Sequence, residues 1–399
     1  MGSMMFALNT ILLSMLVSRI SGVIAAGEFT IAFTTSQILY MVGLYGMQTF
    51  QRTDYIHQYN FEDYFAVKLV TSFFMSLIFI LFITISNFTI TKILLTGLLT
   101  IFMLINSYAE VYQSLLFQEN RLDLSGRVLF FRTFASFLSF LITFLKFRNI
   151  FLALIIMIFV NLAVTYFIAV KTTKKFIYKN KNQKTNKNKV IRLLLDCTPL
   201  FLSSFLSVFM FNSSKYAIEY MLNDEIQGYF NVIFMPAMVI NTISGFLFFP
   251  MLNKFSLYLE KKQFNNFFSC LKKQMLMILG LTICCMIGVL LFGIPILEIL
   301  YGIDISELKN ELILIIIGGG FFAVSMLLFY ILVILRKQNL ILINYMLIAI
   351  FALIFSLVLV KKYGILGASI SFLVSHLVLA LSYIIVLFIQ LNRKKLTKF

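Results

Sequence analysis

Two basic residues stand at corresponding places in the two halves of this sequence, in or beside long apolar stretches. Arg19 falls in the outer half of the first stretch, and Lys215 follows Asn212 at the outer end of the seventh. If both face one lumen between the halves, they make it positive. A diphosphate is the natural ligand of such a pair, because arginine binds phosphate with a planar fork and lysine adds a point charge. We therefore predict a diphosphate site at Arg19, Lys215 and Asn212.

Each of these cations also has a simpler explanation. Arg19 can extend its guanidinium along its own helix to the outer interface, as long basic side chains do. Lys215 can be a loop lysine that pairs with Glu219, four residues later. The sequence leaves these alternatives open.

A polar stripe crosses the fourth apolar stretch. Asn106, Glu110 and Gln113 follow one another at spacings of four and three residues, so they share one face of a helix. An ionisable group at membrane depth costs about 2.5–3.5 kcal/mol, so such a stripe faces protein or water rather than lipid. Glu110 is therefore a candidate for coupling to a proton or a sodium ion, or for pairing with an arginine.

A single histidine, His376, lies in the last apolar stretch. Its imidazole is suited either to a hydrogen bond between helices or to relaying a proton, since its pKa lies near physiological pH. We place it with Glu110 among the candidates for ion coupling or charge pairing.

Catalytic and metal-binding patterns are absent from the sequence. It has no Walker A, HExxH, GxSxG or kinase motif, and its four cysteines form no CxxC pair. No external loop carries the paired carboxylates that a glycosyltransferase or ligase would need. The sequence thus predicts a protein that is not an enzyme, with no metal and no cofactor beyond a coupling H⁺ or Na⁺.

The composition shows what must hold these residues in place. Hydrophobic residues make up 61% of the 399 residues, charged residues make up 12%, and the mean hydropathy is +0.96. A soluble domain has about 45–50% apolar and about 25% charged residues, so lipid must cover the excess apolar surface. The net charge of +17 comes from basic residues between apolar stretches, which indicates membrane topology rather than nucleic-acid binding.

The apolar stretches are long enough to span a membrane, which takes about 20 residues. The leader MGSMMF has no positive segment, so the first stretch is predicted to be a helix and not a signal peptide. We predict an all-α integral membrane protein with about twelve transmembrane helices. These lie near 4–23, 29–49, 66–87, 91–117, 128–146, 150–170, 193–213, 228–250, 274–296, 311–335, 339–360 and 365–391.

Lysine and arginine indicate the orientation. Most of the 33 basic residues fall in one set of loops, to which we assign Arg52, Lys68 and Arg132 as well as the tail after residue 391. Positively charged loops stay in the cytoplasm. Both termini are therefore predicted to be cytoplasmic.

The chain is predicted to consist of two six-helix halves, residues 1–170 and 193–399. The basic stretch 171–192 would be a flexible cytoplasmic linker, able to touch anionic lipid heads. Gly27, Phe29 and Phe33 recur as glycine and two phenylalanines at an offset of 201 residues. Halves of six helices share one orientation, which predicts two parallel pseudo-repeats around a central lumen.

Four stretches of this sequence resemble one protein family. They are Gly27–Tyr64, Gln118–Gly126 (QENRLDLSG), Pro199–Pro250 (which includes FNSSKYAIEY) and Ile299–Gly320. In their order and spacing they resemble the Wzx-like polysaccharide flippases of the MOP exporter superfamily, over essentially the whole chain.

The resemblance implies a V-shaped bundle of two halves around a cationic lumen. It implies transfer of an undecaprenyl-diphosphate-linked oligosaccharide across the bacterial cytoplasmic membrane, with Arg19 and the lysine of KYAI, Lys215, matching the family's basic positions. No further helix pair follows residue 391, which favours a capsule, O-antigen (lipopolysaccharide) or teichoic-type substrate over lipid II. The implied partners are this lipid-linked oligosaccharide, membrane lipids, and the polymerase and glycosyltransferases of the same pathway.

Two other functions compete with this expectation. A multidrug or cation antiporter of the same superfamily would need an acidic lumen, and Glu110 alone faces Arg19 and Lys215 in the count of membrane charges. A membrane polysaccharide polymerase or glycosyltransferase would need a large external catalytic loop, which the sequence does not contain.

Overall fold

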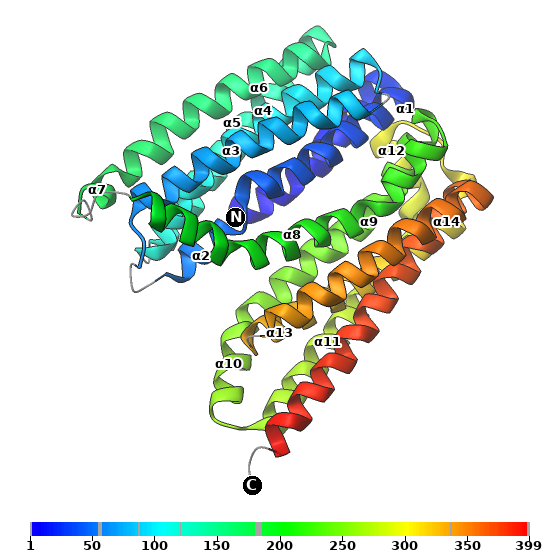
Figure 1. The fold of residues 1–399 in the computed structure, drawn as a ribbon. Helices are drawn as coiled ribbons and strands as arrows, with labels where there is room; N and C mark the ends of the chain where they lie inside the picture. The colour runs from blue at the N-terminus through cyan, green and yellow to red at the C-terminus, as the bar shows by residue number, and fades with distance from the viewer. Residues whose placement is uncertain are drawn as a thin grey trace. The chain divides into compact units, whose positions relative to one another are not determined.

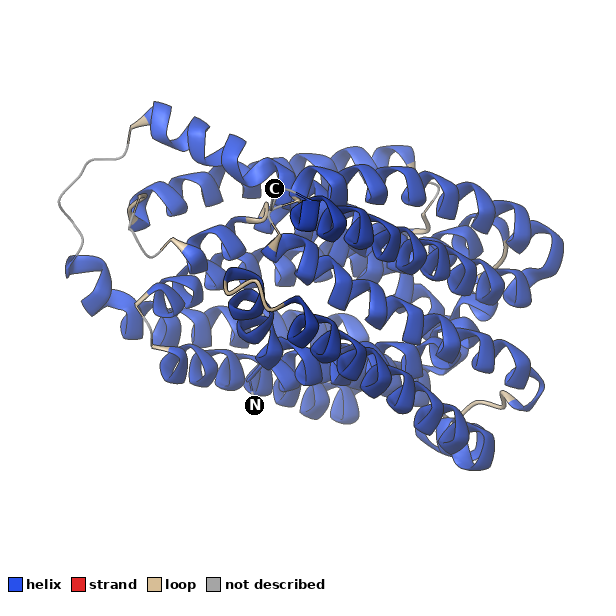
Figure 2. Ribbon diagram, turned by 90° about the horizontal axis from the view of Figure 1, so that it is seen from below, coloured by secondary structure: helices blue, strands red, loops and turns tan. Residues whose placement is uncertain are grey.

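The structure is a computed structural model that describes residues 2–54, 58–86, 88–119, 121–179, 186–335 and 337–396. Throughout these ranges the chain forms helices joined by short loops, and no strand occurs in them (Figure 2). The predicted all-α class is confirmed for this part of the chain.

Ten helical segments among the described residues are long and apolar enough to cross a membrane. Each contains a window of mean hydropathy between 1.6 and 2.7, and only part of that window is buried inside the protein. Apolar side chains exposed in this number need lipid to cover them. The chain is a multi-pass membrane protein.

The chain forms two compact units, Met1–Val208 and Phe209–Phe399. In the first unit, α4 packs on α1, α3 and α6, while α5 packs on α1 and α6 (Figure 1). Its elements are α1 (Gly2–Leu44), α2 (Met47–Thr53), α3 (Phe61–Ile85), α4 (Ile90–Gln118), α5 (Leu122–Phe147), α6 (Ile150–Val164), the π-helical turn η1 (Thr165–Val170), α7 (Lys171–Lys179) and the first part of α8 (Lys187–Met221).

In the second unit α13 is central and packs on α9, α11 and α14. After the last part of α8, the elements are α9 (Asp224–Phe248), η2 (Phe249–Met251), α10 (Leu252–Glu260), α11 (Phe264–Gly288), the π-helical turn η3 (Val289–Gly293), α12 (Ile294–Tyr301), η4 (Ser306–Leu308), α13 (Lys309–Ile334) and α14 (Gln338–Leu396). The short helices α2 and α10 were not predicted from the sequence.

Two glycines interrupt the longest helices. Gly22 in α1 has φ 85°, and Gly364 in α14 has φ 58°, a region that L side chains rarely adopt. At Gly364 the chain reverses, because a Cβ built on Gly367 would lie only 2.1 Å from the carbonyl oxygen of Leu359. Residues eight apart in a straight helix are about 12 Å apart. The predicted gap between the last two spans is thus confirmed, while the first gap lies at Gly22 and not at 24–28.

The predicted linker 171–192 is not a flexible segment along its whole length. Lys171–Lys179 form α7, and α8 begins at Lys187. Residues 180–185 lie outside the described residues. The helix persists because Thr173 is buried and donates a hydrogen bond to the Ala169 carbonyl in the preceding turn.

The glycine triplet of α13 is a packing site. A Cβ on Gly318 would lie 2.6 Å from the ring of Phe372, and one on Gly319 would lie 2.9 Å from the Cα of Ala237. A Cβ on Gly320 would lie 2.6 Å from Thr282. The three glycines therefore let α14, α9 and α11 each come close to α13.

The recurring phenylalanines occupy similar settings in both units. Phe29 and Phe33 are buried with ring centroids 5.9 Å apart, and Phe230 and Phe234 are buried with centroids 5.7 Å apart. Each pair lies one helical turn apart inside its own unit. The sequence repeat therefore corresponds to a repeated core position.

Candidate functional site

The first unit contains an ion pair between α2 and α4. Gly46, with φ 67°, ends the stretch from α1 and directs the chain into α2. Arg52 of α2 donates through Nη2 to Oε1 of Glu110, and its guanidinium lies 4.4 Å from the ring centre of Phe117. The side chain of Arg52 is 33% exposed and that of Glu110 is 9% exposed. The pairing of Glu110 with an arginine, one of its two predicted roles, is present.

Lys68 is buried in α3. It is 1% exposed, and its Nζ donates a hydrogen bond of 2.6 Å to the carbonyl oxygen of Gly43. Gly43 belongs to the last turn of α1, where carbonyl groups lack helical partners and the helix dipole favours a cation. Thr71 donates to the same oxygen at 3.1 Å. Lys68 therefore caps α1 and also carries a positive charge into the interior.

Arg132 is a second fully buried cation, in α5. It is 2% exposed, and its Nη1 has no hydrogen-bond partner among the described residues. It interacts electrostatically with Tyr40 and Glu110, and Lys68 also interacts with Glu110. One carboxylate thus faces Arg52, Lys68 and Arg132, and this part of the interior is net positive.

The assignment of Lys68 and Arg132 to cytoplasmic loops was wrong. Both lie inside membrane-spanning helices, because α3 and α5 begin five or six residues before the apolar stretches by which we had placed them. A basic residue inside an apolar run was the signal that could have identified them. Arg52 gave no such signal, since α2 is short and polar.

The polar stripe of α4 faces the interior, as predicted. Asn106, Glu110 and Gln113 are all buried. Asn106 accepts a hydrogen bond of 3.1 Å through Oδ1 from Asn161 of α6. Gln113 Nε2 and both amide atoms of the buried Gln51 have no partner among the described residues. These unpaired groups are able to bind water or a polar ligand, since leaving them unmet costs free energy.

In the second unit, Lys215 lies inside α8 and is 4% exposed. Its Nζ sits 4.3 Å from the ring centre of Phe234, a cation–π contact. Among the described residues it forms no ion pair, so pairing with Glu219 is not its role. Asn212, one turn earlier, is also buried. The prediction that Lys215 stands at the helix end was wrong, because α8 continues to Met221.

Arg19 is exposed on α1, three residues before the break at Gly22. It belongs to the first unit, whereas Lys215 and Asn212 belong to the second. A shared diphosphate site of Arg19, Lys215 and Asn212 stays a prediction.

His376 is completely buried in α14 among aromatic rings. Its ring lies 4.4 Å from that of Phe372, 5.0 Å from Phe322 and 6.1 Å from Phe211, measured between centroids. Its Nδ1 lies 2.8 Å from the carbonyl oxygen of Phe372, in its own helix. A hydrogen bond between helices is therefore not what Nδ1 makes. Nε2 has no partner among the described residues.

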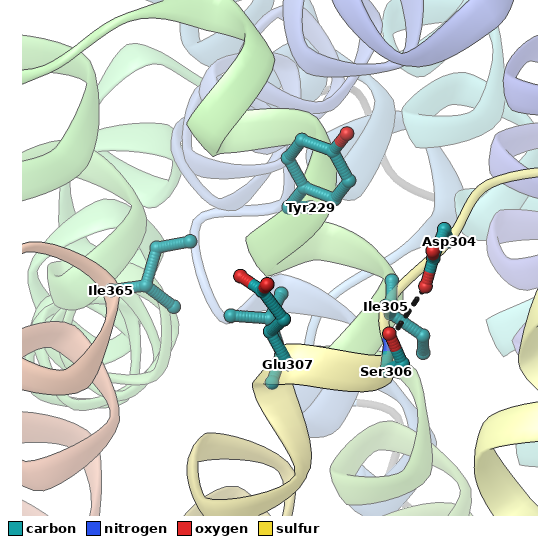
Figure 3. Close-up of a pocket in the computed structure, with 7 residues that line it drawn as sticks. Tyr229, Asp304, Ile305, Ser306, Glu307 and Ile365 are labelled. Atoms are coloured by element: carbon teal, nitrogen blue, oxygen red, sulfur yellow. Dashed lines mark hydrogen bonds between the residues drawn. The ribbon is translucent and has the colours of Figure 1, made fainter.

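A hollow of about 340 Å³ opens in the second unit where α12 leads into α13 (Figure 3). Tyr229, Asp304 and Glu307 line it, and the backbone N–H of Ser306 donates to Asp304 at 2.9 Å. That hydrogen bond lowers the pKa of Asp304, so the carboxylate stays charged. Two carboxylates disfavour an anion here, and we do not count this hollow as part of an anion site. In the described residues, no group of three histidine, cysteine or acidic side chains is placed to hold a metal ion.

Comparison with known proteins identifies the fold. No family model and no curated protein sequence matches this chain. Among solved structures, an inward-facing multidrug resistance MATE transporter of the MOP superfamily has a TM-score of 0.74 at 12% identity, over 100% of this chain and 96% of its own.

Two further structures differ from it in what they are described to do. The lipid II flippase MurJ, in an inward closed conformation, has a TM-score of 0.66 at 17% identity, over 97% of this chain and 87% of its own. A MOP superfamily transporter from Pyrococcus furiosus has a TM-score of 0.63 at 14% identity, over 100% of this chain and 94% of its own. Its description gives a binding pocket of reversed polarity that suggests a different function. The chain thus has the fold of MOP superfamily transporters.

Proposed function

We propose that this protein is a MOP superfamily flippase that transfers an undecaprenyl-diphosphate-linked oligosaccharide across the bacterial cytoplasmic membrane by alternating access. The product would serve cell-surface polysaccharide synthesis, such as capsule or O-antigen. Counting α1 and α14 as two spans each, divided at Gly22 and Gly364, gives the twelve helices of the prediction. The basic loops then place both termini in the cytoplasm.

One observation carries the proposal: buried cations outnumber the buried carboxylate deep in the spans. Lys68, Arg132 and Lys215 are buried there, against Glu110. Burying a charge is costly unless something balances it. An anionic headgroup that enters during transport would supply the balancing charge. Arg19 and Arg52, which reach the surface of the first unit, would be the groups that meet it first.

A multidrug antiporter is the second candidate, and two observations favour it. The MATE transporter has a TM-score of 0.74, and Glu110 is a buried carboxylate of the kind that binds a coupling ion. Against it, a cationic drug would enter a net positive interior. The two candidates therefore predict opposite charges for the substrate.

The test uses purified protein in vesicles that contain a fluorescent undecaprenyl-diphosphate oligosaccharide, and follows its exposure to an external reagent. The intact protein should speed transfer, and Arg19→Ala should reduce it at least about tenfold, as expected for loss of one charge-assisted phosphate contact. Arg148→Ala is the matched control, because Arg148 is an exposed arginine at the end of α5. Normal transfer by Arg19→Ala would remove the assigned role of Arg19.

A second measurement separates the two candidate functions. Cells that lack their own drug exporters would express the protein, and accumulation of a cationic dye would be followed. We expect no change in dye accumulation. Lowered accumulation together with no lipid transfer would establish the antiporter in place of the flippase.

A further inference from the structure

A second hollow, of about 390 Å³, lies in the second unit where α9, η2, α10 and α11 meet. It contains no residue of the sites described above. Its wall combines two lysines, apolar side chains and a buried amide, and that combination is unusual for a surface cavity.

The face of α11 that lines this hollow is continuous. Asn266, Cys270, Lys273, Gln274 and Met277 line it at intervals of one, three or four residues, which places them on one side of the helix. The polar members come first along the chain and Met277 comes last. The hollow thus changes from polar to apolar along α11.

The opposite wall is held in a fixed position by aromatic packing. Phe255 of α10 and Phe267 of α11 are both fully buried, with ring centroids 5.4 Å apart. Lys254 and Tyr258 lie one helical turn apart on α10 and both line the hollow. The contact between the two phenylalanines therefore holds Lys254 opposite α11.

The cations and the amide face the same space. Lys254 and Lys273 both act electrostatically on the thiol of Cys270, although they come from different helices. Gln274 lines the hollow, is 3% exposed, and its Oε1 has no hydrogen-bond partner among the described residues. A buried carbonyl oxygen without a donor is costly, so this site favours a ligand that supplies one.

We propose that this hollow binds an anionic phospholipid of the phosphatidylglycerol type. Lys254 and Lys273 would hold the phosphate, and Gln274 Oε1 would accept a hydrogen bond from a headgroup hydroxyl. Leu247, Met251 and Met277 would contact the acyl chains. A zwitterionic lipid would bring its own cation towards the two lysines and bind less well. This site is independent of what the protein transports.

Its location in the membrane fits such a ligand. Lys261 and Lys262 follow α10 directly, so basic residues gather at this end of the second unit. Each basic residue near an anionic membrane surface contributes about a fivefold gain in affinity. Surface lysines alone would attract any anionic lipid loosely. The hollow would add a defined position for one molecule.

The test measures the rate at which a maleimide modifies Cys270, followed by peptide mass spectrometry in the full-length protein. Protein in detergent would be mixed with dioleoyl phosphatidylglycerol or with dioleoyl phosphatidylcholine. We expect phosphatidylglycerol, and not phosphatidylcholine, to slow modification of Cys270. Cys284, exposed on the same helix but absent from the hollow, should react at the same rate with either lipid.

Two lysine variants make the test specific. Lys273→Gln should raise the phosphatidylglycerol concentration for half-protection about fivefold. Lys272→Gln is the matched control, because Lys272 is the neighbouring exposed lysine and does not line the hollow. Lys254→Gln, on the other wall, should repeat the effect of Lys273→Gln. If one of the two lining variants fails to fold, the other still decides the test.

Three results would overturn the proposal. Equal protection by phosphatidylcholine would show that the headgroup charge is not recognised. An equal loss with Lys272→Gln would show only diffuse attraction to a basic surface. Stronger protection by undecaprenyl diphosphate than by phosphatidylglycerol would assign the hollow to a transported lipid. Failure of lipid transfer in vesicles, by contrast, would count against the flippase function and leave this site unaffected.

Discussion

Replacing Glu110 with glutamine tests the charge arrangement of the first unit. The change keeps the shape of the side chain and removes its negative charge. Glu110 is 7% exposed, pairs with Arg52 and interacts electrostatically with Lys68 and Arg132. Without it, three positive charges would lie close together with no carboxylate among them.

The expected cost follows from how deeply each partner is buried. Removing one member of a buried ion pair costs about 3–5 kcal/mol, because the other charge stays buried and unpaired. The Arg52 side chain is 33% exposed, so water screens its share. Lys68 and Arg132 have no such relief. We therefore expect Glu110→Gln to destabilise the first unit by about 3 kcal/mol.

The reverse change should cost much less. In Arg52→Gln, Glu110 still faces Lys68 and Arg132, so its charge remains balanced. The loss should be about 1 kcal/mol, typical of a partly exposed pair. Glu110→Gln combined with Arg52→Gln should be less destabilised than Glu110→Gln alone, because one repelling cation is gone.

Thermal unfolding of the purified protein in detergent would measure these differences. Glu307→Gln, a change at an exposed carboxylate in the second unit, serves as the control and should match the unchanged protein. If Glu110→Gln unfolds at the same temperature as Arg52→Gln, the three-cation arrangement is wrong. If the double variant is the least stable, the pair acts alone and Lys68 and Arg132 do not contribute.

Two further changes test the second unit. Gly319→Ala should destabilise by about 1–3 kcal/mol, because the new Cβ would lie 2.9 Å from the backbone of Ala237, whereas Gly280→Ala meets nothing within 4 Å and should be neutral or stabilising; equal melting temperatures would contradict the close contact of α13 with α9. Lys215→Met should keep or raise thermal stability, because a charge packed on Phe234 without an ion pair is replaced by an apolar side chain of similar length. The same variant should lose transfer of the lipid diphosphate in vesicles, and unchanged transfer would remove Lys215 from the proposed site.

The sequence by itself determined the class of protein and the positions of its spans. Partitioning into lipid depends on the apolarity of about 20 consecutive residues, which is a local property. The stripe of Asn106, Glu110 and Gln113 was likewise predictable, because helical spacing alone puts these residues on one face. Gly364 separates the last two spans where the apolar run was interrupted.

Only the tertiary structure decided which charges meet. Arg52 reaches Glu110 because α2 packs on α4, and Lys68 reaches Gly43 because α3 packs on α1. Nothing local in the sequence encodes these pairings, since residues 58 or 25 positions apart come together only through helix rotation and packing. The burial of Lys215 over Phe234 has the same origin. Helical period fixes which residues share a face, but the neighbouring helix decides whether that face meets lipid, water or a charge.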